Sequence, residues 1–291
     1  MKVGITYPVM EPGWTGAILK QWAEAIDQGP FSSLSFGERI AYDNPDFMTA
    51  MGACAGWTKR VDLAATVLVA PLYHPVVLAK QLATLDEVSG GRLVAGLGIG
   101  GREDDYLAAG ADLAGRSNAA LAKQVAVMRR VWAGENVSGT LLPTGPTPKP
   151  GRPRLMAGAM GPKAVKAASA WADGITGFSF GPDPKEIEQS IRMIRDTWKQ
   201  AGRPEPKISI GFWMALGPGS RDKMIPHLTR YMNWMDPATV DGIARTAGFT
   251  GTDAEFRTLL RQIKDAGADE ALPAAISWDL DQVRRVADLV A

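Results

Sequence analysis

Segment 60–110 constrains the fold more than any other part of the chain, because it contains two apolar strands joined by one helix. The first strand, RVDLAATVLV, is short and β-branched, and the second, RLVAGLGIG, is apolar at nearly every position. Between them, PLYHPVVLAKQLATLDEVSGG begins with prolines and ends with Gly90 and Gly91, as a helix does. Strands that are apolar on both faces are typical of a parallel sheet covered by helices, so this segment predicts a β-α-β unit.

The alternation of strand and helix continues along the whole chain. Eight segments are predicted as strands: 3–7, 33–36, 62–68, 93–99, 154–157, 174–176, 207–213 and 270–274. Helical patterns fall between and after them, at 16–28, 46–57, 75–88, 117–132, 162–171, 184–201, 238–246 with 253–266, and 280–290. Eight repeats in 291 residues predict an α/β fold, a (β/α)8 TIM barrel formed by residues 1–291 as a single domain. An open doubly wound sheet is the structural alternative.

Two irregular segments interrupt the repeats, and we predict them as insertions after the fourth and seventh strands. Segment 133–152 is rich in Pro and Gly and is predicted as an excursion from the barrel that contains a short hairpin. Segment 217–237 carries His227, Tyr231 and Trp234 between two methionines. Packing is the favoured interpretation of this second segment, and a substrate lid is the alternative.

Charge and cysteine content exclude several classes of protein. With 32 basic and 31 acidic residues, the chain has no excess of positive charge that would favour binding to nucleic acid or to an anionic membrane. The single cysteine, Cys54, cannot form an internal disulfide, and no apolar run approaches the ~20 residues of a membrane span. With two histidines and no HExxH motif, a metal site is not expected. These features predict a cytoplasmic protein, and neither nucleic acid nor a membrane is expected as a partner.

Active sites of such barrels form at the carboxyl ends of the strands, so residues at these ends are the candidate site residues. Gly158, Ala159, Met160 and Gly161 join a strand to a helix that begins with Pro162, which suits a phosphate held by free backbone N–H groups. A tight turn without a ligand is the alternative. The run 96–101 formally matches GxGxxG, but its glycines begin inside the strand, which argues against an NAD site.

Segment 60–110 also resembles the signature of the bacterial luciferase-like monooxygenases. The matching residues are Val67, Leu68, Pro71, His74, Pro75, 78–81, 83–86, 89–92 and 96–100, and weaker similarity extends over 154–174 and 265–272. The resemblance implies a barrel oxidoreductase, most directly a monooxygenase. Such an enzyme uses reduced FMN from a separate flavin reductase, and molecular oxygen, to oxygenate a small organic substrate. It also implies a homodimer.

The same resemblance implies where the cofactor lies. Gly98, Ile99 and Gly100 would lie against the flavin ring, Tyr7 would border it, and the turn at 158–161 would hold the phosphate. A non-prolyl cis peptide with a bulge is implied between Thr66 and Val67, where it would support the ring. An ordinary strand is the alternative at that position.

Glu38 and Arg39 depart from the family pattern. Many members have Glu-His or Asp-His at this place, whereas this chain has Glu-Arg. An arginine does not titrate near neutral pH, but it can bind an anionic intermediate or substrate. Both residues are predicted as catalytic, and a surface salt bridge of Glu38 is the alternative.

Two other functions stay open. Related barrels use the deazaflavin coenzyme F-420 for hydride transfer without oxygen, and basic residues such as Arg102, Arg116 and Lys163 could bind its acidic tail. A flavin-binding protein without turnover is the second alternative, suggested by Arg39. The substrate is expected to be apolar or aromatic because aromatic side chains occur near the strand ends, namely Trp14, Phe36, Phe178, Phe180 and Trp213.

Overall fold

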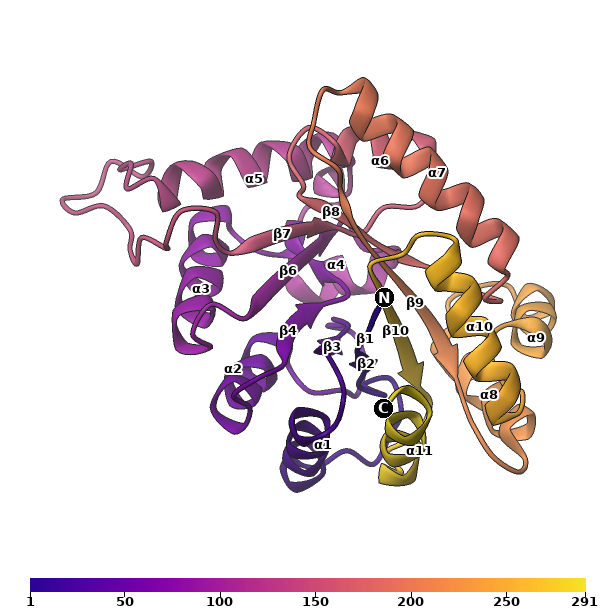
Figure 1. Ribbon diagram of the computed structural model, residues 1–291. Coiled ribbons are helices and arrows are strands. Elements are labelled where there is room, and N and C mark those ends of the chain that lie inside the picture. The colour runs from indigo at the N-terminus through magenta and orange to yellow at the C-terminus, as the bar shows by residue number, and fades with distance from the viewer.

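A computed structural model, which describes all residues 1–291, shows a closed barrel of parallel strands surrounded by helices (Figure 1). The strands are β1 (Lys2–Val3), β2 (Ile5–Thr6), β3 (Ser33–Phe36), β4 (Asp62–Ala65), β5 (Leu68–Val69), β6 (Leu93–Gly98), β7 (Arg154–Ala157), β8 (Gly174–Phe178), β9 (Lys207–Met214) and β10 (Glu270–Ala275). Around the barrel they run β2, β3, β4, β6, β7, β8, β9 and β10, and β10 closes the ring on β1 and β2. The (β/α)8 prediction is confirmed. The open sheet is excluded because an open sheet has two unpaired edge strands, whereas here β10 pairs with strands on both sides and closes the ring.

Helices cover the outside of the ring, as expected for strands that are apolar on both faces. The helices of the chain are α1 (Gly16–Gln28), α2 (Phe47–Trp57), α3 (Pro75–Val88), α4 (Glu103–Ala109), α5 (Asn118–Trp132), α6 (Pro162–Ala168), α7 (Pro184–Gln200), α8 (Ser220–Tyr231), α9 (Pro237–Thr246), α10 (Asp253–Asp265) and α11 (Leu280–Val290). In α7 the residues Ile187, Ile191, Ile194 and Trp198 recur at helical spacing and are the buried ones. None of these helices combines the length and the apolar character that crossing a bilayer requires.

The third strand of the barrel is interrupted at Thr66 and Val67. β4 pairs with β6 before the break and β5 pairs with β6 after it, and the register shifts by one residue between the two pairings. One strand therefore uses an extra residue, which is a β-bulge. The first strand is likewise split, at Gly4, into β1 and β2.

The two irregular segments have different structures. Segment 133–152 contains no strand, so the predicted hairpin is wrong; its four prolines supply no N–H groups for a strand ladder. It extends from the end of α5 away from the barrel (Figure 1). Segment 217–237 is largely helical, because it contains α8, which was not expected across Pro226.

Helices α8 and α9 form a second small core with the carboxyl ends of β9 and β10. Ten buried apolar residues make this cluster, among them Trp213 on β9, Met224 and Leu228 on α8, and Val240 on α9. The favoured interpretation of segment 217–237 as a packing element is therefore correct. Because the cluster lies over strand ends, it also places α8 at the edge of the barrel mouth (Figure 1).

Arg92, a residue of the signature, joins three elements through its guanidinium group. Its Nη1 and Nη2 atoms donate to Thr58 Oγ1 and to the carbonyls of Val61, Ala55 and Thr58 at 2.8 to 3.1 Å, and its Nε donates to the Ser89 carbonyl at 2.7 Å. A lysine ammonium has three N–H donors in a different geometry and leaves some of these acceptors unpaired.

We therefore expect Arg92→Lys to lower the free energy of unfolding by about 2–4 kcal/mol in urea denaturation. The matched control is Arg130→Lys, since Arg130 forms a solvent-exposed ion pair with Glu135. That control should stay within about 0.5 kcal/mol of wild type. Equal stabilities for the two variants would show that the guanidinium geometry of Arg92 is unimportant.

Candidate active site

The predicted site residues lie along one arc of the barrel mouth. Glu38 follows β3, Thr66 and Val67 separate β4 from β5, Gly98 ends β6 and Gly158 follows β7. These strands are neighbours in the ring, and the contacts continue across them. The Glu38 N–H donates to the Val67 carbonyl at 3.1 Å, and the Gly158 N–H donates to the Leu97 carbonyl at 2.8 Å.

The Thr66–Val67 peptide bond is cis, so the predicted non-prolyl cis peptide is confirmed. The side chain of Val67 fills the space beside two glycines of the neighbouring strands. A Cβ atom on Gly98 would lie 2.7 Å from Val67 Cγ2, and one on Gly158 would lie 2.5 Å from Val67 Cγ1. A Cβ atom on Gly100 would lie 2.8 Å from Val69 Cγ1. These glycines therefore make room for the bulged strand itself, and contact between a cofactor and Gly98, Ile99 or Gly100 stays a prediction.

Hydroxyl groups lie beneath the mouth, on the inner side of the barrel. Thr6 Oγ1 and Ser35 Oγ share a hydrogen bond, and Thr66 Oγ1 donates to Ser35 Oγ at 3.3 Å. Their strands are adjacent, and alternation along each strand turns the three side chains to the same face. The floor below the cis peptide is therefore polar.

Glu38 is buried, with 6% of its surface exposed, and forms no ion pair, so the alternative of a surface salt bridge is wrong. Its Oε2 atom accepts the Val69 N–H at 2.7 Å, and its Oε1 atom accepts the Tyr73 hydroxyl. Burial raises the pKa of Glu38 to about 7, against the lowering effect of these two hydrogen bonds. Glu38 can therefore gain or lose a proton near neutral pH. Tyr73 was missed by the sequence analysis because it precedes a helix and carries no local signal.

Arg39 is also buried and pairs with Asp105 on α4. Its Nε atom donates to Asp105 Oδ2 at 2.8 Å, and Asp105 Oδ1 accepts the N–H groups of Ile40 and Ala41 at 2.9 and 2.8 Å. Burial, and then the nearby charge of Arg102, lower the pKa of Arg39. Asp105 could not be singled out from the sequence, because the adjacent acids 103–105 look alike and only the third is buried.

Tyr7 does not face the mouth. Its side chain is 1% exposed, its hydroxyl donates to the Leu19 carbonyl at 2.7 Å, and its ring packs edge-on against Trp22 and Trp278. Alternation along the strand turns Thr6 inward and Tyr7 outward, toward α1. The predicted role of the Tyr7 side chain in cofactor binding is therefore wrong, and burial of its hydroxyl raises its pKa.

An aromatic wall lies on the opposite side of the mouth, at the ends of β8 and β9. Trp213 makes edge contacts with Phe178, Phe180 and Tyr231, with ring centroids 4.6 to 5.6 Å apart. Three of the five predicted aromatic residues thus come together with a residue of α8. Phe36 is instead fully buried beside Phe47, so it lies in the core.

Helix α8 is tied to the loop after β2 by polar contacts. Glu11 Oε2 is 2.8 Å from His227 Nδ1 and also accepts a hydrogen bond from Arg230. Burial raises the pKa of Glu11, but the hydrogen bonds and charges of these two residues outweigh it and lower the pKa. The contacts hold α8 beside the mouth, where a lid would lie.

The turn at 158–161 is partly open. Ala159 is buried, Met160 is 62% exposed, and Gly161 is exposed with φ of +78° and no atom within 4 Å of a Cβ position. Nothing in the chain covers the start of α6. Phosphate binding at Gly158, Ala159, Met160 and Gly161 stays a prediction.

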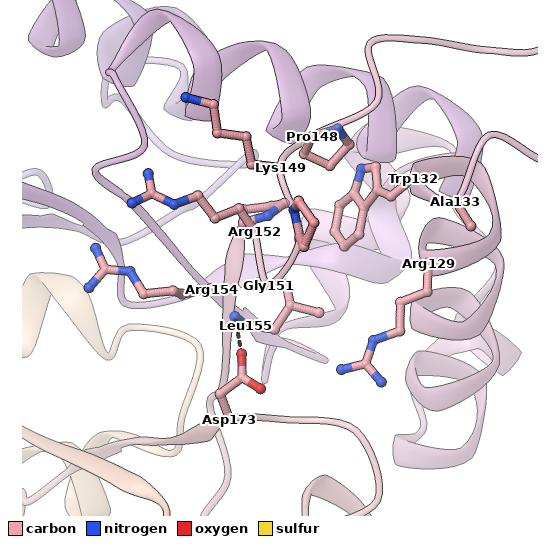
Figure 2. A pocket seen from close by; sticks show the side chains of 12 residues that line it. Arg129, Trp132, Ala133, Pro148, Lys149, Gly151, Arg152, Arg154, Leu155 and Asp173 are labelled. Atoms are coloured by element: carbon pink, nitrogen blue, oxygen red, sulfur yellow. Dashed lines mark hydrogen bonds between the residues drawn. The ribbon is translucent and has the colours of Figure 1, made fainter.

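A cavity of about 560 Å³ lies at the other end of the barrel, among the residues drawn in Figure 2. It adjoins Arg154 and Asp173, at the amino ends of β7 and β8, where Asp173 accepts the Leu155 N–H at 3.0 Å. Two of its four basic side chains have partners: Arg129 donates to the Trp171 carbonyl and Arg154 to Asp62. Since active sites of such barrels lie at the carboxyl ends, we do not assign this cavity to the site.

A family model described as luciferase-like monooxygenase matches residues 9–223 of the chain. The chain belongs to this family. The matched region contains the bulge, Glu38, Arg39 and the turn at 158–161. Known members of the family include monooxygenases and F-420-dependent oxidoreductases, so the family alone leaves the cofactor and the reaction open.

Individual relatives show the same division. An uncharacterized protein of Mycobacterium tuberculosis is 32% identical over 54% of this chain and 57% of its own length. An F-420-dependent glucose-6-phosphate dehydrogenase of Microbacterium testaceum is 28% identical over 63% of this chain and 62% of its own length. The matches therefore span little more than half of these curated relatives. The crystal structure of a monooxygenase of Streptomyces bottropensis superposes with a TM-score of 0.78 over 100% of this chain and 98% of that one, at 23% identity, which shows the fold alone.

Proposed function

We propose that this protein is an oxidoreductase that binds a flavin or deazaflavin ring at the barrel mouth, beside the Thr66–Val67 bulge. The observation that carries the proposal is the bulge that interrupts the third strand at its carboxyl end, on the same arc as Glu38 and Gly158. A strand interrupted at the carboxyl end of a barrel exposes backbone groups where a ligand can meet them.

The residues at the mouth fit a flat aromatic group. Glycines lie at or near the ends of neighbouring strands, at Gly37, Gly98, Gly158 and Gly177, and the Val67 side chain fills the space beside Gly98 and Gly158. The hydroxyl of Thr66 offers a polar contact below the ring, and the backbone of Thr66 and Val67 would border it. The open turn that ends at Gly161 would hold the phosphate, since every candidate cofactor carries one.

Coenzyme F-420 is our first candidate for the cofactor. A curated relative at 28% identity is named as F-420-dependent, and an F-420-dependent secondary alcohol dehydrogenase shares the fold. Reduced FMN with molecular oxygen, which the sequence analysis placed first, is the second candidate. The family description and the similarity to the Streptomyces monooxygenase support it.

The protein's own chemistry in this proposal is proton exchange and exclusion of water. When bound, the deazaflavin supplies the carbon that accepts or gives a hydride. Oxidation of an alcohol by hydride transfer also releases the hydroxyl proton, and Glu38 Oε1, hydrogen-bonded to the Tyr73 hydroxyl, can take it up because its pKa is about 7. The aromatic wall and α8 would shield the reacting groups from water.

Titration of the purified protein with F-420, FMN and their reduced forms, followed by fluorescence, tests the proposal. We expect F-420 to bind at least about tenfold more tightly than FMN, which corresponds to about 1.4 kcal/mol. The reverse order would favour the monooxygenase. If none of the four compounds binds at micromolar concentrations, the proposed function is wrong.

A further inference from the structure

Two arginines at the barrel mouth have buried N–H groups that nothing in the chain accepts. The side chain of Arg39 is 6% exposed; its Nε and Nη2 atoms donate to Asp105 and to the Ala41 carbonyl, and its Nη1 atom has no partner. The Nη2 atom of Arg102 donates to the Tyr231 carbonyl at 3.3 Å, and its Nε atom has no partner. Buried polar groups are nearly always hydrogen-bonded, so an acceptor from a ligand is expected here.

The charges around the two guanidinium groups do not balance. Asp105 pairs with Arg39, while Arg102 forms no ion pair. No carboxylate other than Asp105 lies within ion-pair distance of either guanidinium group, and Glu11 pairs with His227 and Arg230. One positive charge is therefore left without a counterion, and it is close enough to Arg39 to affect the ionisation of that residue.

Apolar surface adjoins this excess charge. The guanidinium carbon of Arg102 lies 4.4 Å from the ring centroid of Tyr231 and 5.3 Å from that of Trp234. Tyr231 continues into the aromatic wall through Trp213, and the residues Phe180 and Trp234 are 43% and 48% exposed. A ligand that meets the arginines can thus lay an apolar body against aromatic rings.

We propose that Arg39 and Arg102 form a subsite for the carboxylate of an apolar or aromatic substrate. One uncompensated positive charge matches a monoanionic carboxylate better than a dianionic phosphate. Two guanidinium nitrogens without acceptors, Arg39 Nη1 and Arg102 Nε, can also each donate to one oxygen of a carboxylate. The inference rests on the proposed function only in assuming that the substrate enters at the mouth.

Benzoate and benzamide are suitable probes, because they have nearly the same shape and differ in charge. They are titrated into the full-length protein without cofactor, with tryptophan fluorescence as the signal. Benzoate should bind about tenfold more tightly than benzamide, since charge-assisted hydrogen bonds are about twice as strong as neutral ones. Inorganic phosphate is titrated in parallel and should compete weakly.

Arg102→Gln should lower benzoate affinity about tenfold and leave benzamide affinity unchanged. Arg39→Lys, which keeps a cation beside Asp105 but lacks the Nη1 donor, should lower benzoate affinity in the same way. The control is Lys223→Gln, which removes a positive charge from an exposed position on α8 and should change neither affinity. Circular dichroism confirms that each variant is folded.

Several results would overturn the inference. Equal affinities for benzoate and benzamide, no benzoate binding at millimolar concentrations, or full benzoate affinity in both arginine variants would each do so. Stronger competition by inorganic phosphate would assign the subsite to a phosphate. Loss of F-420 or FMN affinity in Arg102→Gln, without benzoate selectivity in wild type, would assign it to the cofactor. The benzoate titration needs no cofactor, so its result does not depend on whether the protein binds F-420 or FMN. Failure of the inference can therefore be distinguished from failure of the proposed function.

Discussion

Glu38→Gln is expected to make the protein more stable than wild type at pH 8 and about equally stable at pH 4.5. The pKa of Glu38 is raised from 4.5 to about 7 in the folded protein. A shift of this size corresponds to about 3 kcal/mol, and the side chain is buried deeply enough for solvent screening to be small.

The direction follows from proton linkage. Between pH 4.5 and 7 the folded state binds more protons at Glu38 than the unfolded state does, so stability falls as the pH rises through this window. Above pH 7 the full cost of the buried charge is present. Glutamine has no charge to bury, and its side-chain oxygen can still accept the Val69 N–H. The difference in unfolding free energy between variant and wild type should therefore grow by about 3 kcal/mol from pH 4.5 to pH 8.

Urea denaturation across this pH range measures the difference, with Glu24→Gln as the control. Glu24 lies on the exposed face of α1 with only a loose contact to Lys20, so its replacement should change stability by less than about 0.5 kcal/mol at every pH. A Glu38→Gln protein that is less stable than wild type at pH 8 would contradict this account of the site.

The same variant separates stability from turnover. If Glu38 exchanges the substrate proton, Glu38→Gln should lose about 100-fold or more in kcat while cofactor affinity stays within about twofold. Wild-type kcat/KM should change with an apparent pKa near 7, and this inflection should be absent from the variant. A variant with full turnover would remove Glu38 from the chemistry and leave it a structural role.

Much of the fold could be predicted from the sequence because each strand and helix has a local pattern. The strand at 33–36 and the helices at 16–28 and 75–88 were predicted with their observed bounds, since apolar runs, prolines and glycines mark their ends. Helix α8 was missed because Pro226 lies inside it and its stability comes from the small core that it forms with β9.

From the sequence, the site could be placed at the carboxyl ends of particular strands, but the contacts between its side chains could not be predicted. Because parallel strands all end at one rim, the sequence could bring Glu38, Val67 and Gly158 together. It could not show that Arg39 pairs with Asp105, since the two are 66 positions apart and three adjacent acids compete for the assignment. Whether the Tyr7 side chain points into or out of the barrel depends on where the alternation of side chains begins in this short strand. The break at Gly4 hides that starting point in the sequence.

Gly158→Ala is expected to distort the bulge and to weaken cofactor binding, because a Cβ atom there would lie 2.5 Å from Val67 Cγ1 and 3.3 Å from Val67 Cγ2. Val67 is held between strands β4 and β5, and its carbonyl accepts the Glu38 N–H, so its backbone cannot simply move away from the contact. Overpacking of this kind costs about 1–3 kcal/mol in the free energy of unfolding. We expect the affinity for F-420 or FMN to fall about tenfold or more when the backbone at Thr66 and Val67 is displaced.

The double variant Val67→Ala with Gly158→Ala tests the cause, since it removes both methyl groups that the new Cβ atom would meet. It should recover most of the stability lost in Gly158→Ala, as expected for two residues in direct contact. Gly101→Ala is the control on the same rim, because nothing lies within 4 Å of its Cβ position and its φ is not in the left-handed region. If the double variant is no more stable than Gly158→Ala, the glycine is required for a reason other than the side chain of Val67. Recovery of stability without recovery of cofactor affinity would show that Val67 itself contacts the ring.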